Sequence, residues 1–274
     1  MPQLNVHNLA VVPSAIAASI KGFSSFVPAI APAAPPGIAP APLAPTKPGV
    51  ERWPVKTGLD PDAGRVGTYR FAGINSEGIV PTSVEELIQL PRPADMTDVR
   101  SMQSDYQDKR AEPVELVIWK IKADIIAIKK EADGDLHMVL QGTSGETMIG
   151  EAPTPRSPFV KNGSPWLDAM KEVRKKIADQ FGASFAAASF QPLDAKYVMP
   201  SAPVAPAPAR PAAPLAAPPD GADIFDALQP FKAKVAPTTA TITGVGFFDR
   251  VHDQMGVAMK NGIELHPILA IEFE

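Results

Sequence analysis

Apolar and polar residues alternate along positions 114–130, which is the pattern of a β-strand with one buried face. Val117, Trp119 and Ile121 fall on one side of this strand, and lysines fall on the other. The alternation breaks at Ile126 and Ile128, so we predict a bulge or bend within the strand.

Five more elements follow in the pattern. Strand-like runs cover 136–141 and 146–152, and glycine-containing turns separate the three strands. A helix is predicted over 164–182, since a serine N-cap precedes apolar residues at spacings of three and four and a glycine follows them. Strand patterns return at 239–249 and 263–273.

The order strand, strand, strand, helix, strand, strand is that of a five-stranded OB-fold barrel with one capping helix. We therefore predict a mainly β fold, with an OB-fold-like barrel over 114–274. Gly244 and Gly246 agree with this prediction, because a tight barrel corner needs small residues. Residues 51–113 are rich in turn signals and are expected to form an irregular arm packed on the barrel. In that arm, Ser83 and Glu86 form a capping box that predicts a short helix.

Proline and alanine dominate two segments of the chain. Of 32 prolines, 8 lie in 28–48 and 8 lie in 200–219. Such sequence has few backbone donors and favours an extended polyproline II chain. We expect residues 1–50 to be a disordered leader and linker, and residues at about 186–236 to be a disordered insert within the barrel. The sequence leaves open whether these segments bind a partner or only act as spacers.

Composition excludes several classes of function. The net charge of −4 provides no general attraction for nucleic acid or anionic membranes. The absence of cysteine excludes disulfides and thiolate metal sites. No apolar run is long enough to predict a membrane span. Residues 9–20 resemble a signal-peptide core but no Lys or Arg precedes them, so the cytoplasm is the default expectation and export the alternative.

A first candidate site is acidic. Five acids lie close together with no Lys or Arg among them: Glu131, Asp133, Asp135, Glu146 and Glu151. The candidate metal ligands in this stretch are Asp133, Asp135, His137 and Glu151. Oxygen ligands from a turn and a strand end suit Ca²⁺ or Mg²⁺. The simpler interpretation is that the two aspartates only shape an Asp-Gly-Asp turn.

A second candidate site surrounds the loop between the last two strands. Its polar residues are Asp249, His252, Gln254, Asn261, Glu264 and His266. Imidazoles and carboxylates together can bind Zn²⁺ or transfer protons, and a loop at a barrel mouth is a preferred ligand site. The competing interpretation is that Glu264 and His266, which share one strand face, form a buried hydrogen-bonded pair that orients the last strand.

Four stretches resemble a family of uncharacterised bacterial proteins. They are WPVKTGLDPDA (53–63), VIWKIKADIIAIKKEADGDLHMVLQ (117–141), ETMIGEAPTP (146–155) and TGVGFFDRVHDQMGV…NGIELHPILAI (243–271). That resemblance implies no activity. A looser resemblance, to thermonuclease-type OB-folds, implies a calcium site at Asp133, Asp135 and Glu151. Such enzymes also need arginines near the phosphate, and residues 131–155 contain no Lys or Arg.

The sequence favours a non-catalytic binding module whose protein or small-molecule partner and oligomeric state it does not identify. Nucleic acid is suggested only by analogy of fold, since 136–152 has no Phe, Trp, Tyr, Lys or Arg. The alternative is a metal-dependent phosphodiester hydrolase that uses one of the two candidate sites. Convergence of those sites in space would favour the hydrolase.

Overall fold

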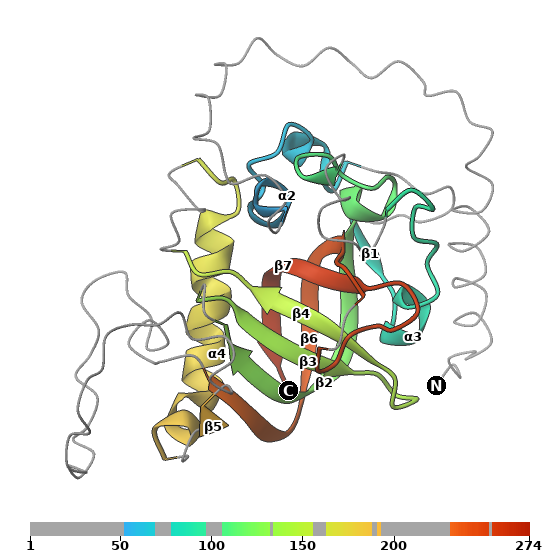
Figure 1. Cartoon of the computed structure of the whole chain (residues 1–274). Coiled ribbons are helices and arrows are strands. Elements are labelled where there is room, and N and C mark those ends of the chain that lie inside the picture. The colour runs from blue at the N-terminus through green and yellow to red at the C-terminus, as the bar shows by residue number, and fades with distance from the viewer. Residues whose placement is uncertain are drawn as a thin grey trace, which may run out of the picture.

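The computed structural model describes residues 52–68, 78–96, 106–131, 134–155, 163–187, 191–192, 231–251 and 254–274. Within these residues the fold is mainly β, and the strands form one seven-stranded sheet (Figure 1). The strands are β1 (Ile79–Pro81), β2 (Ile118–Lys130), β3 (Leu136–Gln141), β4 (Thr147–Ala152), β5 (Gln191–Pro192), β6 (Phe231–Phe248) and β7 (Ile263–Phe273). The helices are α2 (Trp53–Thr57), α3 (Val84–Leu87) and α4 (Leu167–Ala187), with 3₁₀ turns at Ala63–Arg65 and Val114–Leu116.

Five of these strands form a ring, which we call the strand ring. The sheet order β1-β2-β3-β4-β7-β6-β5 is joined by a further pairing of β2 with β6, so β2, β3, β4, β7 and β6 follow one another around it. Neighbours in the ring are antiparallel except β4 and β7, which are parallel. The ring closes unevenly, because β4 and β7 pair only at Ile149↔Glu264 and Gly150↔Leu265.

Two local predictions about the ring are confirmed. The register of β2 shifts between Ile125 and Ala127, where the alternation breaks in the sequence. Gly244 and Gly246 lie where β6 shifts register against β7. A Cβ at Gly246 would lie 2.5 Å from the carbonyl oxygen of Val114, so this corner accepts only glycine without rearrangement.

Helix α4 departs from its prediction at its end. It packs against β7 and β4 (Figure 1). Its apolar stripe, which includes Val173 and Ile177, is buried. We predicted that Gly182 ends the helix, but the helix continues to Ala187. One glycine costs a helix only about 1 kcal/mol, and alanine-rich sequence follows it.

The arm is more regular than predicted. Strand β1 pairs in parallel with the edge of β2, and two short helices flank it in the chain. The predicted capping box is confirmed in part, since the amide of Glu86 donates to Ser83 Oγ at 3.3 Å. One buried ion pair joins the arm to the entry of β2, since Arg52 binds Glu115 at 2.7 Å. A second buried pair, Arg110 with Asp60 at 2.5 Å, holds the arm together internally.

Strand β6 begins at Phe231, eight residues before the predicted start at Thr239. The end of the predicted disordered insert is therefore a strand, because Phe231 pairs with Lys130 of β2. The predicted leader, most of the insert, Asp133 and His252 lie outside the described residues. In the part of the chain that the structure describes, no helix is both long and apolar enough for a membrane crossing.

Candidate metal centre

A group of buried polar side chains lies on the face of the ring strands that points away from the main apolar core. The alternate residues Leu136, Met138 and Leu140 of β3 belong to that core, so His137 points to the opposite face. Glycine 256 lies against this face as well, since a Cβ there would lie 2.8 Å from Val139. The arm and the β6–β7 loop cover this face and remove the polar group from water.

Strand register brings the group together. His137 of β3 is directly opposite Glu151 of β4. Ile149 of β4 pairs with Glu264 of the parallel strand β7. Two residues further along both strands, Glu151 comes level with His266. The two candidate sites in the sequence therefore meet at Glu151.

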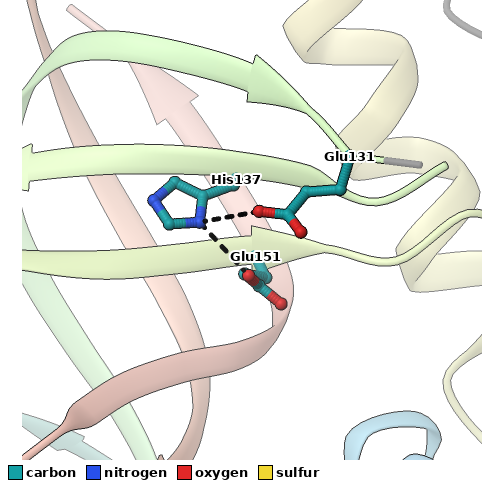
Figure 2. A group of neighbouring side chains, drawn as sticks. All are labelled: Glu131, His137 and Glu151. Atoms are coloured by element: carbon teal, nitrogen blue, oxygen red, sulfur yellow. Dashed lines mark ion pairs between the residues drawn. The ribbon is translucent and has the colours of Figure 1, made fainter. Parts of the chain in front are cut away.

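One ring nitrogen of His137 faces two carboxylates (Figure 2). Its Nδ1 is 3.5 Å from Glu131 Oε1 and 3.4 Å from Glu151 Oε1. Its Nε2 is 2.9 Å from the carbonyl oxygen of Met255, to which it donates. That hydrogen bond fixes the ring orientation and directs the Nδ1 atom at the carboxylates. The amide of Gln254 lies 3.2 Å from the same Nδ1.

His266 occupies the other side of Glu151. Its Nδ1 lies 2.7 Å from Glu151 Oε2, and its Nε2 lies 4.0 Å from Asp135 Oδ2. The predicted hydrogen-bonded pair of Glu264 and His266 is wrong: both are buried, but they are 4.0 Å apart, because Glu151 lies beside the ring nitrogen. Within the described residues, three atoms make no hydrogen bond of acceptable geometry: both ring nitrogens of His266 and Glu264 Oε2.

Lys56 of α2 is the cation nearest to Glu151 among the described contacts. It is 5% exposed, and its Nζ lies 3.8 Å from Glu151 Oε2 and 5.4 Å from the centre of the Phe247 ring. Sequence reasoning missed this residue, because nothing in its local pattern shows that α2 packs against β7.

Burial and neighbouring charges shift the pKa values of the side chains in this polar group. Burial lowers the pKa of His137, but hydrogen bonds to Glu131 and Glu151 outweigh it and raise that pKa from 6.5 to about 9. Burial raises the pKa of Glu151, but the charges of Lys56 and His266 hold it well below its usual range. The pKa of Glu264 is well above its usual range because of burial and the charge of Glu151. Burial lowers the pKa of His266, and Glu151 offsets only part of that effect.

The remaining predicted residues have other surroundings. The side-chain amide of Asn261 donates to the carbonyls of Leu87 and Leu90, both at 3.0 Å, so it anchors the loop to the arm. The carbonyl of Asp249 accepts from Arg92. Glu146 is exposed on the β3–β4 turn. Among the described residues of the β6–β7 loop, Gln254 is the predicted residue that reaches His137.

Two sets of side chains have the composition of a metal site. The first is Glu131, His137 and Glu151, and the second is Asp135, Glu151 and His266. In each set the ligand atoms lie within 4.8 Å of one another. Only Glu151 belongs to both sets.

Comparisons with known proteins do not identify a family for this chain. The chain matches no protein-family model, and no match was found among curated proteins or solved structures. The two resemblances seen in the sequence stay predictions.

Proposed function

We propose that this protein is a binding module whose ligand is a divalent transition metal, held by Glu131, His137 and Glu151 on an OB-fold-like barrel. The observation that supports this most directly is the position of His137 Nδ1, which faces a carboxylate oxygen at 3.4 Å and another at 3.5 Å.

These separations match a metal site better than a hydrogen bond. A normal N–H···O bond spans about 2.7–3.2 Å. Ligand atoms about 2.1 Å from a tetrahedral ion are about 3.4 Å from each other. Both separations from His137 Nδ1 therefore match an ion between the groups, and all three ligand atoms lie within 4.8 Å of one another. An imidazole among the ligands favours Zn²⁺ or a similar ion over Ca²⁺ and Mg²⁺.

The surroundings of His137 support the same proposal. A metal-bound histidine usually donates its second N–H to a carbonyl or carboxylate, and here Nε2 donates to Met255 O. Gln254 supplies a fourth candidate ligand. Its Oε1 is buried without a hydrogen-bond partner in the described residues, and rotation of the amide would exchange Oε1 with the Nε2 that now lies beside His137.

The burial of the centre favours a structural role for the ion. His137 is fully buried and Glu151 is 6% exposed. Structural zinc sites are closed in this way, whereas catalytic sites keep one position open to substrate. An ion here would join β3, β4 and the end of β2, so its binding would stabilise the ring.

A phosphodiester hydrolase is the second candidate. The convergence of the two sites at Glu151 favours it, and Lys56 provides a cation beside Glu151 that residues 131–155 lack. Metal ions and a nearby cation are what such a reaction uses to neutralise the phosphate.

Thermal unfolding with and without metal tests the proposal. The metal-stripped protein is compared with protein given Zn²⁺, Mn²⁺, Mg²⁺ or Ca²⁺, and a chelator then reverses the effect. We expect Zn²⁺ to raise the melting temperature of the wild type and of Glu146→Gln, a control on the exposed turn, but not that of Glu151→Gln. The absence of a shift with every ion, together with no binding by calorimetry, would refute metal binding.

The same proteins separate the two candidates. Hydrolysis of bis(p-nitrophenyl) phosphate in the presence of the bound ion, abolished by Glu151→Gln and by Lys56→Met, would support the hydrolase. Tight metal binding without turnover supports the binding module.

A further inference from the structure

We infer that the centre binds two divalent ions that share Glu151 as a bridging carboxylate, the first beside His137 and the second beside His266. This inference rests on the proposed metal binding and specifies the kind of metal site. A two-ion centre bound by histidines and carboxylates takes ions about 3.5–4 Å apart.

Glu151 has the orientation that a bridge requires. Its Oε1 lies 3.4 Å from His137 Nδ1, and its Oε2 lies 2.7 Å from His266 Nδ1. Each oxygen of the carboxylate therefore faces a different imidazole. A bridging carboxylate gives one oxygen to each ion, so the two histidines become ligands of different ions.

The two ligand sets do not merge into one. Each set fits within 4.8 Å, and Glu151 is the member that they have in common. A single ion would have to leave one of the histidines without a role. Two ions, one on each side of Glu151, give a metal partner to both.

The second position also contains buried polar atoms that need a partner. His266 is fully buried and Glu264 is 2% exposed. His266 Nδ1 has Glu151 Oε2 at 2.7 Å, but within the described chain His266 Nε2 and Glu264 Oε2 make no hydrogen bond. A buried polar atom without a partner costs about 1–3 kcal/mol, so native proteins rarely retain several together. Carboxylates lie near both nitrogens of His266: Glu264 Oε2 is 4.0 Å from Nδ1, and Asp135 Oδ2 is 4.0 Å from Nε2.

Asp135 completes the second set. Its Oδ1 accepts from the amide of Thr154 at 2.9 Å, which orients the carboxylate, and its Oδ2 lies 4.0 Å from His266 Nε2. Asp135 precedes β3 directly, and His266 lies within β7. The second ion would therefore join β3 and β7 across the part of the ring where β4 and β7 pair at only two positions.

Metal content and electron paramagnetic resonance with Mn²⁺ test the number of ions. After removal of free metal from the full-length protein, we expect two ions per chain in the wild type and in the control Glu146→Gln. We expect one ion per chain in His137→Asn and in His266→Asn, and no bound ion in Glu151→Gln. Manganese spectra should show two magnetically coupled ions in the wild type and an isolated ion in His266→Asn.

The outcomes distinguish this inference from the proposed function. One ion per chain in the wild type, with the spectrum of isolated Mn²⁺, would overturn the shared centre and leave metal binding in place. No bound ion at all would overturn both. If His266→Asn fails to fold, Asp135→Asn tests the same position: retention of two coupled ions in that variant counts against the second site, and loss of one supports it.

Discussion

Replacement of Glu115 by alanine should be among the most destabilising single changes in this protein. Glu115 is fully buried and accepts hydrogen bonds from both terminal nitrogens of Arg52, each at 2.7 Å. Its carboxylate also accepts the backbone amides of Ala111 and Phe248, each at 2.7 Å. One carboxylate therefore joins the arm, the entry to β2 and the end of β6.

The expected loss follows from what the substitution leaves behind. Removal of one partner of a buried ion pair costs about 3–5 kcal/mol, because the other charge remains buried without compensation. Each of the two backbone amides left without its acceptor adds about 1 kcal/mol or more. We expect Glu115→Ala to lower the free energy of unfolding by about 5 kcal/mol. Since the total for a natural domain is about 5–15 kcal/mol, the variant can fail to fold at 37 °C.

The loss should also reach the metal centre. Arg52 precedes α2, which contains Lys56, and its guanidinium lies 4.6 Å from the centre of the Phe247 ring. That ring is 5.4 Å from the ring of His266. If the arm detaches, Lys56 leaves Glu151 and the centre becomes exposed to water.

Urea unfolding of metal-stripped protein, followed by tryptophan fluorescence, measures the change. Glu112→Gln is the matched control, because Glu112 pairs with Arg65 at the surface and such pairs contribute about 0–1 kcal/mol. The pair Arg52→Met with Glu115→Leu should recover much of the lost stability, since it removes both buried charges. A loss below about 1.5 kcal/mol in Glu115→Ala would refute the role that we assign to this ion pair.

Three further predictions concern the centre. The raised pKa of His137 means that the folded state favours its imidazolium form, so the contribution of His137 to the stability of the metal-stripped protein is fully present below pH 6.5 and is lost as the pH rises toward about 9. The stabilisation by Zn²⁺ should increase over pH 6–8, since the ion competes with that proton. Over this range the melting temperature should fall with pH for the metal-stripped protein and rise for the zinc-loaded protein, and parallel trends would contradict this prediction. Lys56→Met should bind Zn²⁺ about tenfold more tightly, because a cation 3.8 Å from Glu151 Oε2 is removed. Calorimetry measures the affinity, and an unchanged value would show that the charge of Lys56 does not oppose the ion. Gly256→Ala should weaken metal binding and lower the free energy of unfolding in urea by roughly 1–3 kcal/mol. The reason is that Gly256 has φ +86° and an added Cβ would meet Val139 at 2.8 Å. A variant as stable as the wild type would show that the loop does not pack on β3.

Much of the strand arrangement follows from the sequence because its causes are local. Period-2 alternation is a property of neighbouring residues, and it placed β3, β4 and β7 at or within one residue of their observed bounds. The predicted tight turn between β3 and β4 also determines which residues face each other, since Gln141 opposite Thr147 requires His137 opposite Glu151. Half of the candidate centre is thus implied by one hairpin.

Other features depend on partners that are distant in the chain. The start of β6 is set by pairing with Lys130 of β2 rather than by the pattern near Phe231, which is why the strand was predicted to start eight residues later, at Thr239. The end of α4 was also missed, because the cost of Gly182 is small beside the packing of the whole helix on the ring.

The composition of the candidate metal centre was decided by tertiary structure. Candidate ligands in two separate stretches were visible as His, Asp and Glu, but their sequence spacing matches no metal motif. They meet at Glu151 because β7 lies parallel to β4 and because α2 brings Lys56 onto the same face. Local periodicity states which face of a strand a side chain occupies, whereas the closure of the ring and the packing of the arm determine what that face meets.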